Sequence, residues 1–359
     1  MQVKLFTPIR LGSVEVANRI SIPPMCMYSA RSGIAQPFHL VHYGRLALSG
    51  AGLVCIEAAA VTPEGRITEG DLGLWSDECE AGMARIVETM KSLNPEVKVI
   101  VQISHAGRKA SAKRPWEGGG ARMPAEGGWR VLAPSPIPFA EGFALPRALT
   151  FDECAALAKA FGEAAARAVR AGADGVEIHM AHGYLIHEFL SPLSNQRIDE
   201  YGGALENRMR FACEVMDAVR MRVPEGALVG LRISATDWVE DGFQPDEAEA
   251  LVRAARVHGL DFVDVSTGGN TPDAPIPAGP GYQVEFAARM KRACDMPVIA
   301  VGLIANAWQA ETLLAEGSAD MIDVGRAVLD DPNWGWHAAR DLGVKGLKVP
   351  APYERGIRL

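Results

Sequence analysis

The sequence predicts a single (β/α)8 barrel of the TIM type, an α/β fold in which eight parallel strands alternate with helices. Three observations support this prediction. Short apolar runs rich in β-branched residues recur along the chain, longer stretches with helical periodicity separate them, and several of those stretches end in glycine just before the next run. Barrels of this kind commonly exceed about 250 residues as one domain. We therefore interpret residues 1–359 as one domain.

The expected strands are short, and helical patterns lie between them. Residues 155–172 and 248–259 repeat apolar positions at the 3.6-residue period of an amphipathic helix. Gly172, Gly259 and Gly317 stand where a helix C-cap would precede a strand. The expected strands are IPPM (22–25), LVCIEA (53–58), KVIVQI (98–103), GVEIHM (175–180), LVGLRIS (228–234), FVDVSTG (262–268), VIAVG (298–302) and MIDVG (321–325).

Two segments lie outside this repeating pattern. The N-terminal stretch FTPIRLGSVEVANRI (6–20) has the pattern of a β-hairpin that could plug the barrel floor. About 70 residues separate the third strand from the fourth, and residues 104–150 among them are rich in glycine and proline. A loop of that length is usually functional or disordered. We interpret it as a lid that carries Trp116 and Trp129, with a disordered insertion as the alternative.

Composition narrows the class of protein. No apolar run reaches the roughly 18 residues of a membrane helix, and the first residues lack the apolar stretch of a signal peptide. The six cysteines are scattered singly, which suits a reducing cytosol. A formal charge of −8 argues against a nucleic-acid partner, because phosphate backbones need a basic surface. We expect a cytoplasmic protein without nucleic-acid or membrane partners.

Catalytic groups of such barrels lie at the carboxyl ends of the strands. In this sequence, polar, cationic and glycine residues stand at those positions, which indicates a large, partly anionic ligand. The residues concerned are Met25 with Cys26, Ala58, Gln102, His179, Arg232, Gly268 with Gly269, Gly302, and Gly325 with Arg326.

The last two strands indicate a phosphate site. AVGLI (300–304) and DVGRA (323–327) each place a glycine where backbone N–H groups can approach an anion closely. Phosphate sites in barrels typically form from the loops after strands seven and eight. Arg326 can add a bidentate contact. The alternative is a strand-end turn with a solvated arginine.

The fourth strand is followed by the most specific motif, EIHMAHGYLIHEFLSP (177–192). His179 ends the strand, and His182 and Tyr184 follow in the turn. Two imidazole N–H donors one turn apart can converge on one oxygen, and a tyrosine with a pKa near 10 can supply a proton at neutral pH. A histidine pair satisfied by the backbone at a helix start is the alternative.

A metal site is a further alternative, because HxxH and the earlier HLVH (39–42) both offer ligand spacing. Zinc usually takes a third protein ligand, and Glu188 is the only carboxylate near the turn. We expect no metal. We interpret His187 and Glu188 as residues that orient the following helix, and Arg108 and Lys109 as loop cations outside the site.

These motifs resemble those of a known family. HMAHGYLIHEFLSPLSNQRIDEYGGALENR (179–208) resembles the signature of the old yellow enzymes, and the similarity runs almost end to end. The resemblance implies FMN bound non-covalently across the barrel mouth, reduction by NADPH or NADH, and hydride delivery to an activated alkene. Further segments resemble the thermophilic-like bacterial subclass: PPMCMYSA (23–30), QISHAGRK (102–109), GLRISATDW (230–238), DVGRAVLDDPNW (323–334) and PYERG (352–356).

The resemblance implies one set of residues for the cofactor. Arg232 would face the N1–C2 carbonyl region and stabilise the anionic reduced flavin, and Cys26 would tune its potential with Arg232, unless Cys26 is only a small buried hydrophobe. Gln102 would hydrogen-bond to the pyrimidine edge. The whole set is Pro23, Pro24, Met25 and Cys26 along the flavin, Ala58, Gln102 and Arg232 at the isoalloxazine, and Gly302, Gly325 and Arg326 at the phosphate.

A second set would bind the substrate, an enone or a nitro compound. His179 and His182 would bind its carbonyl oxygen, and Tyr184 would protonate the α-carbon. Tyr28 would add a contact, unless it is only an aromatic residue at the rim. In the subclass a C-terminal arginine reaches the neighbouring subunit's site, which implies Arg355 in the tail 350–359 and a homodimer or homotetramer.

Three other functions remain open at this stage. An FMN barrel of different specificity could couple to an iron–sulfur cluster, but no cysteine follows Cys294 to bind one. A metal-dependent hydrolase is the second. A flavoprotein that acts as a redox sensor or binding protein is the third. The 104–150 segment is longer than expected for the subclass, and the tail runs three residues past PYERG.

Overall fold

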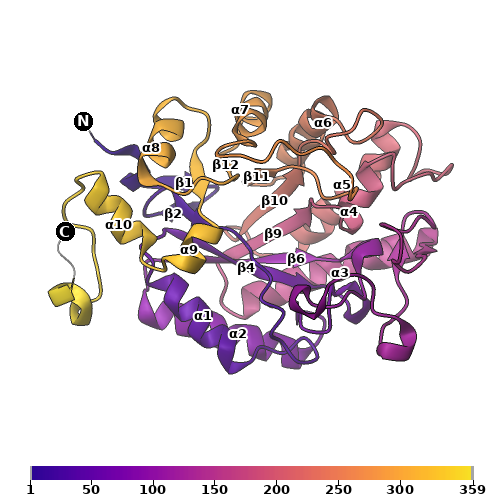
Figure 1. Cartoon of the computed structure of the whole chain (residues 1–359), viewed down its shortest axis with the longest axis horizontal. Coiled ribbons are helices and arrows are strands. Elements are labelled where there is room, and N and C mark those ends of the chain that lie inside the picture. The colour runs from indigo at the N-terminus through magenta and orange to yellow at the C-terminus, as the bar shows by residue number, and fades with distance from the viewer. Residues whose placement is uncertain (1, 357–359) are drawn as a thin grey trace.

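The structure, a computed structural model, describes residues 2–356 and contains the predicted barrel (Figure 1). Neighbouring strands pair in parallel in chain order, and the pairing of the last strand with the first closes the ring. A short strand β5 (Leu72–Gly73) pairs alongside β4. The strands of the ring are β3 (Ile20–Ile22), β4 (Leu53–Ala60), β6 (Lys98–Ser104), β9 (Gly175–Met180), β10 (Leu228–Ser234), β11 (Phe262–Ser266), β12 (Val298–Ala300) and β13 (Met321–Asp323).

The prediction of the first strand is wrong in its bounds. Residues 22–25 were expected to form it, whereas β3 ends at Ile22. Pro23 and Pro24 follow, and proline has no N–H to donate to a parallel ladder. The chain instead runs over the barrel rim from Pro23, which places this segment where a ligand could lie against it.

Helices surround the strands, with α1 and α2 on one side in Figure 1 and α6, α7 and α8 on the opposite side. Thr150 caps α3 by accepting a hydrogen bond from the Glu153 N–H, which starts that helix four residues before the predicted 155. The helices are α1 (Pro37–Ala47), α2 (Asp77–Leu93), α3 (Phe151–Arg170), α4 (Leu185–Leu190), α5 (Leu205–Arg222), α6 (Pro245–Val257), α7 (Val284–Ala293), α8 (Ala307–Ala315), α9 (Arg326–Asp330) and α10 (Trp334–Asp341). None of the helices within residues 2–356 has the length and apolar character that crossing a membrane requires.

The N-terminal hairpin closes one end of the barrel, as predicted. Strands β1 (Ile9–Leu11) and β2 (Val14–Val16) pair antiparallel. Leu11 and Val16 are fully buried against inward-facing side chains at the amino ends of the strands. The opposite, carboxyl end of the strands is therefore the end available to a ligand. The side chains beneath the hairpin are Leu53, Cys55, Ile100, Leu228, Phe262, Ile299 and Met321.

A buried layer of polar side chains lies above this apolar floor, and we call it the polar layer: Gln102, Glu177, Arg232, Asp264 and Asp323. Side chains two residues apart on a strand point to the same face. Three residues of the layer therefore lie directly above floor residues that stand two positions earlier on the same strand: Gln102 above Ile100, Asp264 above Phe262 and Asp323 above Met321. Strand register places Gln102 beside Glu177 and Arg232 beside Asp264.

The segment between β6 and α3 has a defined conformation. It contains three short 3-10 helices and a two-stranded sheet of β7 (Leu132–Ala133) and β8 (Arg147–Ala148). The indole N–H of Trp129 donates to the Glu64 carbonyl (2.9 Å). The ring of Trp116 lies 6.0 Å from that of Tyr28, centroid to centroid. These contacts place the segment beside the rim, and its role as a lid remains a prediction.

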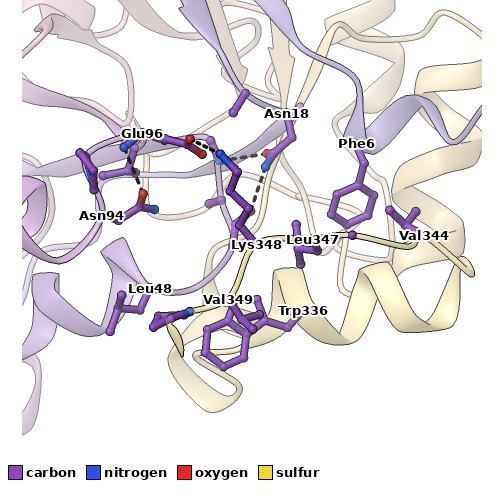
Figure 2. Close-up of a pocket in the computed structure, with 18 of the residues that line it drawn as sticks. Phe6, Asn18, Leu48, Asn94, Glu96, Trp336, Val344, Leu347, Lys348 and Val349 are labelled. Carbon is purple, nitrogen blue, oxygen red and sulfur yellow. Dashed lines mark hydrogen bonds and ion pairs between the residues drawn. The ribbon is translucent and has the colours of Figure 1, made fainter. Parts of the chain in front are cut away.

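The C-terminal segment lies at the other end of the molecule's long axis from the 104–150 segment in Figure 1. It ends in a 3-10 helix (Ala351–Gly356), where the Tyr353 ring lies 6.0 Å from the ring of Trp336. Residues 344–350 cover a cavity of about 500 Å³, in which Lys348 pairs with Glu96 (Figure 2). Residues 357–359 of the predicted tail lie outside the described part of the chain.

Candidate active site

The turn after β9 brings three predicted site residues together. The ring centroid of His179 lies 5.3 Å from that of His182 and 4.9 Å from that of Tyr184. His182 adopts a left-handed backbone conformation (φ 60°), and Tyr184 is the N-cap of α4. The sharp turn between strand and helix therefore points two imidazoles and one phenol into the same space.

A backbone hydrogen bond assigns the proton of His179, and burial keeps both imidazoles neutral. The Ala181 N–H donates to Nδ1 of His179 (3.3 Å), so the proton of a neutral His179 lies on Nε2. Nε2 of His182 lies 2.7 Å from the Ser266 hydroxyl oxygen. Burial, reinforced by nearby Arg232, lowers the pKa of both histidines well below the usual value. Both imidazoles are therefore neutral near pH 7.

Ser266 is the hydrogen-bond partner of His182. Its hydroxyl lies 2.7 Å from Nε2 of His182 and 3.2 Å from Gln283 Oε1, and Gln283 also accepts a 2.7 Å hydrogen bond from Thr267. The hydroxyl has one proton, so it donates either to Gln283, with the ring proton of His182 on Nε2, or to Nε2, with the ring proton on Nδ1.

Tyr184 remains a phenol. It packs in an apolar cluster with Cys26, Tyr28 and Ala106. Burial raises its pKa well above the usual value, and the neighbouring Tyr28 and Cys26 add to the shift. The hydroxyl is therefore protonated over the physiological range and can act as a proton donor.

Cys26 and Tyr28 lie in the segment that follows the two prolines. The Cys26 thiol lies beside the Ala58 backbone and the Tyr28 hydroxyl, and burial raises the thiol's pKa well above its usual value. Glu57 holds this segment, because its Oε2 accepts the Met27 N–H (2.9 Å). The predicted residues Cys26, Tyr28, Ala58 and Tyr184 therefore lie on one side of the rim.

The histidines of the HLVH stretch are used in packing. Nδ1 of His39 accepts the Gln36 N–H (3.0 Å) at the start of α1, and its Nε2 faces Glu57 at 3.7 Å. His42 stacks on Phe38, with ring centroids 5.8 Å apart. Across residues 2–356 no three histidine, cysteine, aspartate or glutamate side chains are grouped so that they could hold a metal ion.

The phosphate residues predicted after β12 and β13 adjoin the rim segment. A Cβ added to Gly325 would lie 3.3 Å from Pro23 Cγ and 3.7 Å from Met25 Sδ. Gly302 has a φ of +132°, a conformation that favours glycine. Arg326 is exposed, and it has no ion-pair or hydrogen-bond partner in the described part of the chain. Two glycines and a free guanidinium form a cradle that suits a phosphate group.

The cofactor's ring system would meet the polar layer. Nε of Arg232 lies 2.8 Å from Asp264 Oδ2, and its terminal nitrogens make no hydrogen bond to any residue from 2 to 356. Gln102 uses one amide N–H for Glu177 (Nε2 to Oε1, 2.8 Å) and keeps its carbonyl oxygen free. These groups can bind a heterocycle with carbonyl and nitrogen edges, so the site residues fit FMN.

The interpretation of Arg108 and Lys109 as loop cations outside the site is wrong. Nζ of Lys109 donates to the backbone carbonyls of His182 (2.9 Å) and Gly269 (3.0 Å). It also lies 5.1 Å from the Tyr184 ring centroid, and burial lowers its pKa to about 8. Arg108 is buried and donates to the Asn270 carbonyl (2.6 Å). Their position shortly after the carboxyl end of the third strand, where site residues of such barrels lie, could have identified them from the sequence.

His187 and Glu188 make contacts within the protein. Nδ1 of His187 accepts the Gly183 N–H (2.9 Å), and its Nε2 lies 3.1 Å from Asp237 Oδ1. Glu188 accepts the Arg108 N–H (2.7 Å).

Sequence reasoning also missed Asp264 and Asp323 of the polar layer. A charged residue at an inward position of an apolar strand would have identified them.

A model of the family described as NADH:flavin oxidoreductase / NADH oxidase matches residues 4–343. The chain belongs to this family. It is 43% identical over 360 residues to the NADPH dehydrogenase of Geobacillus thermodenitrificans (strain NG80-2), with all of both chains covered. It is 42% identical over 358 residues to the NADPH dehydrogenase of Bacillus subtilis (strain 168), covering 99% of this chain and all of that one.

Solved structures agree with this family. A morphinone reductase in complex with tetrahydroNAD superposes with a TM-score of 0.77 at 27% identity, covering 98% of this chain and 96% of that one. The old yellow enzyme homologue from Zymomonas mobilis superposes at 0.78 with 23% identity, covering 96% and 94%, and it shares the fold. The resemblance to the old yellow enzymes is thereby confirmed. As a member of this flavin oxidoreductase family, the chain is an FMN-dependent enzyme with NAD(P)H as reductant.

Proposed function

We propose that this family member is an ene-reductase. Bound FMN would supply hydride transfer, first from NADPH or NADH and then to the β-carbon of an alkene activated by a carbonyl or nitro group. The single observation that supports the proposal best is the cluster of His179, His182 and Tyr184, in which two neutral imidazoles and one phenol share one space. Such a set suits a substrate that gains negative charge on an oxygen and then a proton on carbon.

His179 and His182 would bind the substrate oxygen. The Nε2 proton of His179 makes no hydrogen bond to residues 2–356. With Ser266 donating to Nε2 of His182, the ring proton of His182 would lie on Nδ1 and be free as well. Neutral donors that are already in place stabilise a developing oxyanion without reorganisation. Loss of one such donor typically costs about 3–4 kcal/mol of transition-state stabilisation. The donors would therefore act mainly on the enolate-like charge.

Tyr184 would give the α-carbon its proton. Its phenol is protonated because the surrounding apolar side chains raise its pKa. Lys109 lies against the ring and at the same time holds the His182 carbonyl. This ammonium group would stabilise the phenolate that remains after the proton leaves, because an opposite charge favours the ionised form.

The remaining site residues would hold the cofactor. Arg326 with Gly302 and Gly325 would bind the phosphate, and Arg232 and Gln102 would meet the ring edge. The rim segment Pro23, Pro24, Met25 and Cys26 with Ala58 would lie along the ring. The contacts between Gly325 and this rim segment support the arrangement, because they bring both groups to one side of the barrel mouth.

The tail would complete the site of a neighbouring subunit. Tyr353 is 51% exposed and Arg355 is exposed. Tyr353 packs on Trp336, which itself contacts Gly50 just before β4, at the amino end of the barrel. The tail therefore lies away from the rim of its own chain. An exposed ring and cation on a proline-stiffened segment suit an intersubunit contact, so we propose a homodimer or homotetramer with Arg355 at the shared site.

Separated half-reactions test the proposed function. We expect purified protein with flavin absorbance near 450 nm, rapid bleaching by NADPH without oxygen, and reoxidation by cyclohexenone. Stopped-flow mixing measures each step by itself. Reduction by NADPH without reoxidation by enones, maleimides or nitroalkenes would contradict the ene-reductase proposal and favour a redox sensor. A protein without flavin would contradict the cofactor assignment as well.

A further inference from the structure

The polar layer contains more carboxyl groups than cations. Glu177, Asp264 and Asp323 share the barrel interior with Arg232, and each of the four side chains is at most 6% exposed. Removing a charge from water costs several kcal/mol unless a partner compensates it. One guanidinium cannot compensate three ionised carboxylates, so some of these carboxyl groups must hold protons.

One of those protons belongs to the pair of Asp264 and Asp323. Within the described residues neither carboxyl oxygen of Asp264 has a hydrogen-bond donor, and the charge of Asp323 adds to the rise of the Asp264 pKa. A buried carboxyl group in that setting favours its protonated form. Burial raises the pKa of Asp264 well above its usual value and that of Asp323 as well, although Arg232 opposes both shifts. The pair therefore carries one negative charge, which Arg232 balances at 2.8 Å from Asp264.

Glu177 then determines the net charge of the layer. Its Oε1 accepts a 2.8 Å hydrogen bond from Gln102. Burial raises its pKa to about 7, the Arg232 charge opposes this rise, and Asp323 adds to it. The layer is neutral when Glu177 is protonated and carries one negative charge when it is ionised. Both states are accessible near neutral pH.

The other titratable groups that face Glu177 are uncharged. Cys55 on β4 lies near it, and burial raises the pKa of this thiol well above its usual value. His179 is two residues further along the same strand, and its pKa is lowered well below the usual value by burial. Within the described residues, Glu177 is therefore the member of this group that changes charge near pH 7.

We propose that the polar layer binds a proton when the flavin is reduced, and that Glu177 is the residue that takes it. The inference rests on the proposed placement of the flavin against Arg232. A hydride from NADPH adds one negative charge to the site and leaves NADP⁺. That charge favours protonation of Glu177, so a solvent proton forms an O–H bond with its carboxylate. The proton returns to solvent when the flavin is reoxidised. Glu177 is thus a positioning residue that acts through Arg232.

The test compares the reduction potential of the FMN-loaded wild type with that of Glu177→Gln at about pH 5.5 and about pH 8.5. These values lie on either side of the Glu177 pKa of about 7. We expect equal potentials at the lower pH, where Glu177 is protonated in both redox states. At the higher pH the variant should favour reduced flavin by roughly tenfold, or about 30 mV for a two-electron couple. A constant difference at both pH values overturns the inference.

Asp264→Asn is the matched control. Its neutral amide replaces one carboxyl of a pair that carries a single negative charge, so the variant should keep the pH dependence of the wild type. Loss of that dependence in Asp264→Asn would overturn the assignment to Glu177.

A second measurement needs no variant. A pH indicator should record more protons taken up by the wild type on anaerobic reduction at about pH 7.5 than at about pH 5.5. Equal uptake overturns the inference even if Glu177→Gln fails to fold. Turnover of cyclohexenone tests the proposed ene-reductase function independently. Protein that shows the expected uptake without reducing enones would support the inference and contradict that function.

Discussion

Replacing Ser266 with alanine should slow alkene reduction while leaving flavin reduction by NADPH unchanged. The Ser266 hydroxyl lies 2.7 Å from Nε2 of His182, and by donating to that nitrogen it would keep the ring proton on Nδ1. Without the hydroxyl, a neutral His182 can carry its proton on either nitrogen, and one of the two tautomers presents a lone pair to the substrate oxygen. The substitution therefore reduces the share of enzyme with both donors in place.

The size of the effect follows from the hydrogen bond that is lost. A typical intramolecular hydrogen bond contributes about 0.5–1.5 kcal/mol net, and a short one lies at the upper end of that range. A bias of about 1.4 kcal/mol between tautomers corresponds to a factor of about ten. Losing that bias lowers the share of enzyme in the productive tautomer from about nine-tenths to about half. We therefore expect a roughly twofold slower reaction with cyclohexenone. His182→Ala removes the donor completely and should cost about 10²–10³.

Stopped-flow measurement of the two half-reactions separates these effects. Thr267→Val is the matched control. It removes a neighbouring hydroxyl, which donates to the same Gln283 oxygen (2.7 Å), without touching His182. We expect it to leave the reaction with enones unchanged. Equal loss in both half-reactions for Ser266→Ala would refute the tautomer argument. Wild-type rates with cyclohexenone would refute it too.

Three further substitutions test the proposed roles. Tyr184→Phe should slow alkene reduction by about 10² or more and spare flavin reduction, because only the second half-reaction needs a proton; equal loss in both steps would contradict the role. Arg326→Ala should weaken FMN binding by about 10-fold or more without lowering the melting temperature of the apoprotein, since Arg326 is exposed and makes no contact within residues 2–356; fluorescence titration with FMN checks this. Arg355→Ala should raise the Michaelis constant for enones severalfold at unchanged flavin content, and unchanged kinetics and sedimentation after deletion of residues 353–359 would show that the tail has no such function.

Much of the barrel could be predicted because its strands are buried on both faces and therefore stand out as apolar runs. The strand ends were harder to place. The run that begins at Ile22 looks apolar through Met25, but Pro23 and Pro24 cannot donate to the ladder and β3 lies before them. The predictions for β4, β6, β9 and β10 were close, since no proline interrupts those runs.

The rim residues were predictable for a topological reason. Closing a parallel barrel brings every strand's carboxyl end to the same rim, so His179 and Arg232 converge whatever path the loops take. Lys109 was different. It lies in a long loop, and a loop lysine is usually solvated. Only the return of that loop across the turn after β9 places its ammonium group against the His182 and Gly269 carbonyls.

The polar layer could be predicted in part: the positions of its residues, but not their partners. Its members occupy inward positions of predicted strands, and Glu177 stands two residues before His179 on the same face. The sequence therefore shows that Glu177 and His179 face the same side of their strand. It does not show which side chains meet across strands, because that depends on the stagger between neighbouring strands, which the strand sequences do not specify. Register places Arg232 beside Asp264 and Glu177 beside Gln102. A different stagger would leave two carboxylates without the cation, which would cost several kcal/mol for each buried charge. The ion pairs of the barrel interior therefore favour the same strand register that positions the residues of the rim.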